Sequence, residues 1–351
     1  MLTPTLKQAL EEKEIEALLV THRENIAYLC GFYGSLGVLL LWENPVLFVD
    51  GRYYTQAKEE AKNCEVVWAK NLFWNTVCEQ IKNRGLKRLG FEESHLSYHL
   101  YRILRDRLRG IRLIPLSDVV ERERMIKQAW EIERIEQAQR LSEEALSHCL
   151  AFLKEGISEK DLAVELEFYI KKKGGDLAFE SIIAFGERSA LPHAKCTTRK
   201  LKKGDIVLFD IGARVEGYCS DMTRVFFFGK PQEDLIEIYY AVLNAQQKVI
   251  DAIRAEMKGS EADEIARSEL REKGFADLFT HSLGHGVGRE VHELPALAPY
   301  VEEKLPPNCV VTVEPGVYIE GIGGVRIEDM VLVMEDGSKD LTKFTKELTI
   351  L

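Results

Sequence analysis

The chain has 351 residues, 46% of them hydrophobic, which is enough for a large core and more than one domain. A formal net charge of −10 and a pI near 5.5 argue against a protein that binds nucleic acid or an anionic membrane through bulk charge. The seven cysteines are scattered without a Cys-x-x-Cys pair, which favours reduced thiols in a cytoplasmic protein over a disulfide framework.

No segment of the sequence has the pattern of a membrane anchor. The longest aliphatic run, residues 38–42, is far too short to span a bilayer. The first eight residues contain no apolar signal segment. We therefore expect a cytoplasmic protein without membrane association.

Residues 1–122 are predicted to form a separate α/β domain. Apolar periodicity indicates helices at 5–13, 53–62, 72–84 and 96–108, and strands at 17–20, 37–42, 46–49, 66–69 and 88–91. This region shows no dense cluster of catalytic residue types, so we expect it to cover a site or to mediate dimerisation. Residues 50–54 are interpreted as a strand-to-helix turn, with a contribution to a neighbouring site as the alternative.

Residues 123–351 are predicted to form the second domain, which begins within the charged segment 121–124. A long amphipathic helix is expected at 127–153 and is ended by Gly156. Ser158 and Asp161 have the spacing of a capping box that opens a helix at 159–172. The segment 156–163 resembles 259–266, and a second long helix at 234–257 precedes the latter. Two α–α–β halves related by a pseudo-two-fold axis are therefore expected.

Residues 205–223 read as a β-hairpin that carries two aspartates. If Val215 and Glu216 form its tip, Asp210 faces Asp221, and directly opposed residues have Cβ atoms roughly 4.5–5.5 Å apart. Two carboxylates this close repel each other unless a positive group lies between them. The alternative interpretation is a solvated pair at the edge of a sheet.

Further candidate ligands follow towards the C-terminus. Residues 279–292 contain three of the eight histidines, among them His285 within Gly-His-Gly-Val-Gly. Glu314 ends an apolar strand, and the two-residue period of the next strand places Arg326 and Glu328 on one face. A Gly-rich turn separates Glu314 from Glu328, which predicts a second cross-strand carboxylate pair. Two such pairs and one histidine make a ligand set for two hard divalent cations.

Together these motifs resemble the pita-bread metallopeptidases of the M24 type, specifically the aminopeptidase P and prolidase branch. Residues 25–32 and 48–53 are similar to the creatinase-like N-terminal domain of that branch. The resemblance implies a metal set in the catalytic domain made of Asp210, Asp221, His285, Glu314 and Glu328. Further matches fall on His193, His281, His292 and Arg326. The implied fold is an α/β creatinase-like domain followed by an α+β pita-bread catalytic domain.

The resemblance also implies how the metal ions are held. Asp221 and Glu328 would bridge two divalent ions, Asp210 would bind one, and His285 with Glu314 the other. Carboxylate-rich ligation favours Mn²⁺, with Co²⁺, Zn²⁺ or Fe²⁺ as alternatives.

Roles in the reaction follow from the same resemblance. Glu314 would accept a proton from a water shared by the two ions, and the resulting hydroxide would attack the scissile carbonyl. His292 and His193 would donate hydrogen bonds to the oxyanion or the substrate, and His281 would line the pocket for the residue after the cut. Arg326 would neutralise excess carboxylate charge.

The expected activity is hydrolysis of the N-terminal Xaa-Pro bond of peptides by a homodimer. Proline has no N–H and a fixed φ, so peptidases that bind substrate as an extended strand lose a hydrogen bond there. Aminopeptidase P takes longer peptides, whereas a prolidase takes dipeptides, and the sequence leaves this choice open. Methionyl aminopeptidase has the same five ligands but lacks the N-terminal domain, and creatinase lacks metal. A catalytically silent peptide-binding module is the alternative from another class.

Overall fold

The computed structural model describes residues 4–70 and 72–351, and these divide into two compact units between Arg124 and Met125. The prediction that the first eight residues contain no signal segment falls partly on residues 1–3, which lie outside the described residues. Within the described residues, no helix has both the length and the apolar character that a membrane span requires.

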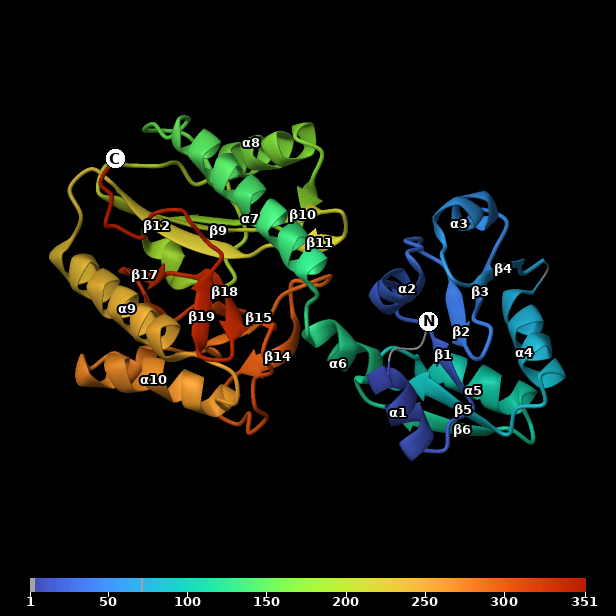
Figure 1. The fold of residues 1–351 in the computed structure, drawn as a ribbon. Coiled ribbons are helices and arrows are strands. Elements are labelled where there is room, and N and C mark those ends of the chain that lie inside the picture. Colours follow the sequence, from blue (N-terminus) through green and yellow to red (C-terminus); the bar gives the residue numbers. More distant parts are fainter. Residues whose placement is uncertain (1–3, 71) are drawn as a thin grey trace. The chain divides into compact units, whose positions relative to one another are not determined.

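The N-terminal unit is built on a six-stranded sheet with the order β4-β3-β2-β1-β5-β6 (Figure 1). The neighbours β1–β2 and β2–β3 are antiparallel, and the other three pairs are parallel. The strands are β1 (Ala17–Val20), β2 (Val38–Leu41), β3 (Val46–Val49), β4 (Glu65–Trp68), β5 (Arg88–Glu92) and β6 (Arg112–Leu116). The helices are α1 (Pro4–Glu12), α2 (Arg23–Cys30), α3 (Tyr54–Glu60), α4 (Phe73–Asn83), α5 (Tyr98–Arg107) and α6 (Val119–Met125).

Helices cover both faces of this sheet, which explains its continuous apolar strands. Leu18 and Val20 pack into one apolar cluster, and Ala17 and Leu19 pack into another. Strands buried on both faces have uninterrupted runs of aliphatic residues rather than alternation. The predicted α/β class and each predicted helix and strand of this unit are confirmed, while α2, β6 and α6 were not predicted.

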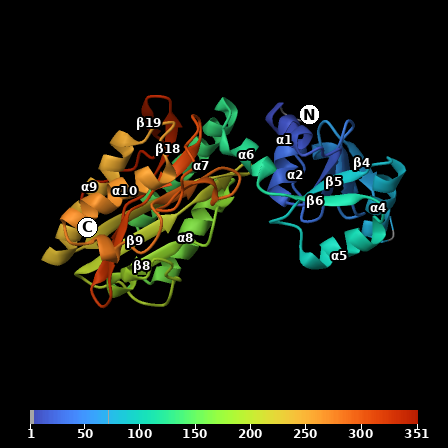
Figure 2. The same cartoon turned by 90° about the horizontal axis from the view of Figure 1, so that it is seen from below.

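The second unit, Met125–Leu351, corresponds to the predicted catalytic domain and is called the catalytic unit below; it contains four long helices in two pairs. They are α7 (Ala129–Leu150), α8 (Glu159–Lys172), α9 (Glu233–Ala252) and α10 (Gly259–Glu272). The capping box of α8 is confirmed, because the Asp161 backbone N–H donates to Ser158 Oγ at 3.2 Å and the Ser158 N–H donates to Asp161 Oδ2 at 3.0 Å. Helices α9 and α10 lie side by side, as do α7 and α8 (Figures 1 and 2).

The internal repeat is present, but its predicted alignment was wrong by three residues. Helices α8 and α10 have 14 residues each. Each is followed by a Lys-Gly pair whose glycine has a positive φ. Gly156, with φ 86°, therefore corresponds to Glu256, with φ 67°, and not to Gly259. The prediction matched glycines of different kinds, because Gly156 lies in a loop whereas Gly259 is the first helical residue.

Each half of the catalytic unit adds its own strands. The first half has β7 (Asp176–Leu177), β8 (Ile182–Phe185), β9 (Asp205–Ile211), β10 (Ala213–Val215), β11 (Tyr218–Cys219) and β12 (Met222–Phe228), in two three-stranded sheets. The second half has β13 (Gly284–Gly286), β14 (Glu293–Leu297), β15 (Val310–Val313), β18 (Asp329–Met334) and β19 (Gly337–Asp340) in one sheet, and β16 (Gly316–Ile319) with β17 (Gly323–Arg326) in another. A bridge between Thr223 and Glu328 joins the halves.

The hairpin at 205–223 forms, but with a different register from the predicted one. Its tip is Glu216-Gly217, where both residues have positive φ (48° and 86°), as a two-residue turn of type I′ requires. Val215 therefore pairs with Tyr218, and Asp210 faces Thr223 instead of Asp221. The prediction placed the tip one residue too early, and this moved each partner by two positions.

Candidate metal centre

A cavity of about 670 Å³ lies between the two halves of the catalytic unit. Its wall includes all nine residues predicted for the site, namely His193, Asp210, Asp221, His281, His285, His292, Glu314, Arg326 and Glu328. Four of them come from carboxylate pairs on separate hairpins, so the fold brings together residues more than a hundred positions apart in sequence.

The first carboxylate pair remains within one site despite the register change. Asp210 lies on β9, and Asp221 is the residue immediately before β12. Asp221 Oδ1 is buried and has no hydrogen-bond partner among the described residues. A buried carboxylate oxygen without a donor is costly, so this atom is well suited to bind a cation.

The second pair has the predicted cross-strand arrangement. Val313 pairs with Asp329 on one side and Gly316 with Arg326 on the other. The same register carried into the gap places Glu314 opposite Glu328. Thr223 then links this pair to the first hairpin, because its hydroxyl donates to Glu328 Oε2 at 2.7 Å.

His285 is held in the tautomer that suits a metal ligand. Its Nδ1 lies 3.1 Å from the Gly286 carbonyl oxygen, which can only accept, so Nδ1 is the donor. Nε2 then faces carboxylate oxygens of Glu314 at 3.3 Å and Asp221 at 3.7 Å. A neutral ring would place a lone pair against two acceptors, and either a proton or a bound cation resolves that conflict.

Gly284 allows the histidine strand to approach so closely. A Cβ at this position would lie 2.1 Å from the Thr312 carbonyl oxygen on β15. The neighbouring His285 N–H donates to Thr312 Oγ1 at 3.1 Å, which fixes the backbone next to the ligand. The glycines around His285 therefore determine where its ring lies.

Several buried carboxylates of this site lie close enough to raise one another's pKa values. Burial raises the pKa of Asp221 well above its usual value, and the charges of Glu328, Asp210 and Glu314 raise it further. Burial, Glu314 and Asp210 have the same effect on the pKa of Glu328. Carboxylates with pKa values raised in this way hold protons that a divalent cation can replace.

Glu314 behaves differently from the other carboxylates. Burial opposes its ionisation, but the hydrogen bond and charge of His285, with His281 and Arg326, hold the pKa of Glu314 below its usual value. Glu314 is therefore the carboxylate of the cavity with the strongest tendency to remain ionised when no cation is bound.

Arg326 connects the carboxylates to a group that the sequence analysis missed. Its guanidinium contacts Asp210 Oδ2 at 2.5 Å and donates to the Tyr318 hydroxyl at 2.8 Å. His281 Nε2 lies 2.8 Å from the same hydroxyl. Tyr318 lies eight residues before Arg326 in an apolar strand, and no motif in the sequence marks it as part of a site.

The donor set fits divalent cations. Ligand atoms of Asp221, His285 and Glu328 all lie within 4.8 Å of one another. Glu314 contacts His285 of this group, whereas Asp210 is paired with Arg326. Carboxylate oxygens with one imidazole are ligands suited to Mn²⁺, Fe²⁺, Co²⁺ or Zn²⁺.

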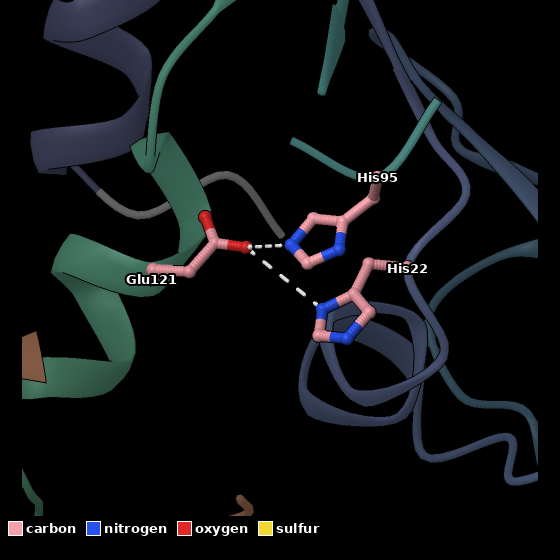
Figure 3. Close-up of side chains that lie close together, drawn as sticks. All are labelled: His22, His95 and Glu121. Atoms are coloured by element: carbon pink, nitrogen blue, oxygen red, sulfur yellow. Dashed lines mark hydrogen bonds and ion pairs between the residues drawn. The ribbon is translucent and has the colours of Figure 1, made fainter. Parts of the chain in front are cut away.

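A second cluster of ligand types lies in the N-terminal unit, where none was predicted. His95 Nε2 and His22 Nδ1 lie 3.1 Å and 3.8 Å from Glu121 Oε1 (Figure 3). The two imidazoles stack with centroids 3.6 Å apart and planes within 3° of parallel. Because a ring nitrogen binds a metal in the plane of its ring, these parallel rings do not direct both lone pairs at one ion.

Comparisons with known proteins match both units. Residues 133–335 match the model of metallopeptidase family M24, and residues 4–126 match the creatinase/prolidase N-terminal domain. The Xaa-Pro dipeptidase of Pyrococcus furiosus is 37% identical over 98% of each chain. A structure of Xaa-Pro dipeptidase from Bacillus anthracis has 40% identity and a TM-score of 0.95 over 99% of this chain and 98% of that one. The X-Pro aminopeptidase from Thermotoga maritima has 36% identity and a TM-score of 0.90, covering 97% of this chain and 99% of its own.

Proposed function

This chain belongs to metallopeptidase family M24, and from that membership we propose that it hydrolyses the Xaa-Pro bond at the N-terminus of short peptides. It is a metal-dependent hydrolase with a creatinase-type N-terminal domain and a pita-bread catalytic domain. The observation that carries the proposal is the convergence of nine predicted residues on one cavity.

Within this activity, we place the chain closer to dipeptidases than to aminopeptidases that act on longer peptides. Relatives at 37–40% identity over nearly the whole chain carry the name Xaa-Pro dipeptidase. The Thermotoga structure, named X-Pro aminopeptidase, keeps the aminopeptidase as the second candidate.

The proposed metal ligands are the five residues Asp210, Asp221, His285, Glu314 and Glu328. In this assignment these five side chains would together hold two divalent ions. When bound, the ions supply Lewis-acid polarisation of the scissile carbonyl and lower the pKa of a water. We propose Mn²⁺ as the native ion, because the set is rich in carboxylate oxygens.

Glu314 is the proposed general base. Its pKa is held low by His285, so it is ionised and able to take a proton before the reaction begins. Glu314 lies in the wall of the cavity, as its cross-strand partner Glu328 does.

Histidines supply the remaining polar contacts in this proposal. Burial lowers the pKa values of His281 and His292, so both rings are neutral near pH 7. The single N–H of His281 is directed at the Ser282 carbonyl oxygen at 2.8 Å. His292 and His193 would donate to the carbonyl oxygen as charge develops on it, and His281 would line the pocket for proline. Arg326 would compensate the negative charge of Asp210, with which it forms a 2.5 Å contact.

Three peptides test the substrate assignment. Purified protein with added Mn²⁺ should cleave Ala-Pro rapidly, Ala-Pro-Ala slowly, and Met-Ala-Ser not at all. Faster cleavage of Ala-Pro-Ala would reassign the chain to the aminopeptidases, and cleavage of Met-Ala-Ser alone would indicate a methionyl aminopeptidase. No cleavage of any peptide with Mn²⁺, Co²⁺, Zn²⁺ or Fe²⁺ would instead support a binding module.

Two further properties belong to the proposal. We propose that the chain acts as a homodimer in the cytoplasm, which suits its seven free thiols. Light scattering of the active protein tests the first property, because a fully active monomer would contradict it. Cell fractionation tests the second.

A further inference from the structure

The loop that carries His193 is tied at both ends to a single buried carboxylate. Glu159, the first residue of α8, has a fully buried side chain. It accepts hydrogen bonds from four donors: Phe185 N at 3.0 Å, Arg188 Nε at 3.0 Å, Thr197 N at 2.8 Å and Thr197 Oγ1 at 2.6 Å. A carboxylate removed from water is stable only when its oxygens are satisfied in this way.

These donors flank His193 on both sides. Arg188 precedes it by five residues and Thr197 follows it by four. The Arg188 guanidinium also donates to the Lys195 carbonyl oxygen at 2.6 Å, inside the loop. The carboxylate therefore closes a short loop whose tip, Pro192-His193, lies in the wall of the cavity.

The position of Glu159 on the helix strengthens this arrangement. A negative charge in the first turn of a helix interacts favourably with the unsatisfied N–H groups there. The Glu159 N–H itself donates to the Arg199 carbonyl oxygen at 3.2 Å, beyond the end of the loop. Side chain and backbone of one residue thus hold the loop against α8.

The second half of the catalytic unit contains a comparable device. Asp263 on α10 accepts from Leu283 N at 3.1 Å and pairs with Arg267 at 2.6 Å. Arg267 in turn donates to the carbonyl oxygens of Phe279 and His281 at 3.0 Å and 2.7 Å. In each half, a buried carboxylate paired with an arginine fixes a segment that brings a histidine to the cavity.

We propose that Glu159 is a positioning residue, which acts on the reaction by fixing His193 at the wall of the cavity. The proposal rests on the proposed function only for the role of His193. Glu159 lines no part of the cavity and acts only through the loop.

A double-mutant cycle tests the coupling. Glu159→Gln keeps the size of the side chain but removes its charge, and should lower kcat/KM for Ala-Pro about 10- to 100-fold, because small misplacements of catalytic groups have effects of this size. His193→Ala should lower it at least as much, and the double variant should be no slower than His193→Ala alone. Additive losses, or wild-type kinetics in Glu159→Gln, would overturn the proposal.

Two controls separate positioning from general damage. Glu167→Gln changes a partly exposed glutamate on the same helix, which pairs only at the surface with Lys171, and should leave kcat/KM unchanged. Bound Mn²⁺ per chain, measured by mass spectrometry of the metal, should be equal in wild type and Glu159→Gln. Loss of metal from Glu159→Gln would show a collapsed centre and contradict a role confined to the loop.

A measurement without substrate keeps this proposal independent of the peptidase assignment. Amide hydrogen exchange of residues 191–197 should be at least about 10-fold faster in Glu159→Gln, with no change in α9. Unchanged hydrogen exchange in these residues would refute the positioning role of Glu159 even if the enzyme cleaves peptides. If wild type cleaves no peptide, the peptidase assignment fails. The exchange result still decides whether Glu159 holds the loop in place.

A milder variant covers the case in which Glu159→Gln does not fold. Thr197→Val removes the 2.6 Å hydroxyl donor and leaves the carboxylate in place. It should show the same faster exchange in residues 191–197 to a smaller degree, and unchanged exchange there would count against the proposal.

Discussion

The two histidine–carboxylate clusters of this chain differ in the balance between donors and acceptors. In the N-terminal unit, Glu121 receives hydrogen bonds from His95 and Asn25, which outweigh the effect of burial and lower its pKa to about 2. In the catalytic unit, carboxylates outnumber donors, and burial with mutual repulsion raises the pKa values of Asp221 and Glu328.

Ring geometry sharpens the same contrast. His22 and His95 are parallel, and their contacts with Glu121 complete a local ion-pair cluster (Figure 3). His285 instead has its Nδ1 committed to a carbonyl and its Nε2 directed at two carboxylates. The same residue types thus favour a cation only in the second cluster, where negative charge exceeds the available hydrogen-bond donors.

The largest effect is expected at Glu314, the carboxylate of the cavity with the lowered pKa. Glu314→Ala removes the proposed proton acceptor and one metal ligand, so kcat for Ala-Pro should fall by about 10²–10⁴-fold or more, with weaker binding of one ion. Glu121→Ala, in the other cluster, should keep normal kcat. Near-normal turnover in Glu314→Ala would remove this residue from the mechanism.

Removal of bound metal should lower the thermal stability of the catalytic unit only. A ligand present at a thousand times its Kd stabilises the state that binds it by about 4 kcal/mol. Chelation should therefore lower the unfolding temperature of the catalytic unit in calorimetry and leave the N-terminal transition in place. Equal shifts of both transitions would contradict the assignment of the two clusters.

A substitution at Thr223 tests how the proposed metal ligand Glu328 is held in place. Its hydroxyl donates to Glu328 and accepts from Arg326 Nε at 3.1 Å. Thr223→Val keeps the shape of the side chain, and loss of a contact behind a ligand weakens metal binding about 10- to 100-fold. Titration calorimetry with Mn²⁺ measures this, with Thr342→Val as a buried control outside the cavity wall. Equal affinities in wild type and Thr223→Val would exclude the role.

The smallest effect is the acid sensitivity of the N-terminal unit. The folded pKa of Glu121 lies below its usual value of 4.5, so its stabilising contribution is present above pH 4.5 and is lost as pH falls towards 2. Glu121→Gln should reduce the loss of stability between these values by about 1.5 kcal/mol, the lower end of the range for hydrogen bonds to charged groups. Urea unfolding of that unit at pH 5 and pH 3 gives the difference, and an identical pH dependence in both proteins would contradict it.

Most of the fold was predictable because apolar periodicity and capping residues act locally. Ser158 and Asp161 define the start of α8 from four residues, and uninterrupted aliphatic runs define β1 to β3. Helix α2 was missed because its sequence, Arg-Glu-Asn-Ile-Ala-Tyr-Leu-Cys, has neither a capping side chain nor a clear apolar period.

Errors in register came from turns, where one residue decides the outcome. The hairpin tip depends on which two residues take positive φ, and Glu216 does so although glutamate rarely adopts that conformation. The repeat was misaligned for a similar reason, since Glu256 takes the place of a loop glycine.

The sequence by itself determined which residue types are available for a cation site and on which strands they lie, because strand period and turn position are local properties. Only the tertiary structure decided which donors reach them. Tyr318 meets both Arg326 and His281, and Glu159 meets both ends of a loop, through contacts between distant elements. His22, His95 and Glu121 likewise meet only because three separate segments pack together. Their parallel rings and a carboxylate with enough hydrogen-bond donors distinguish this cluster from the proposed metal centre.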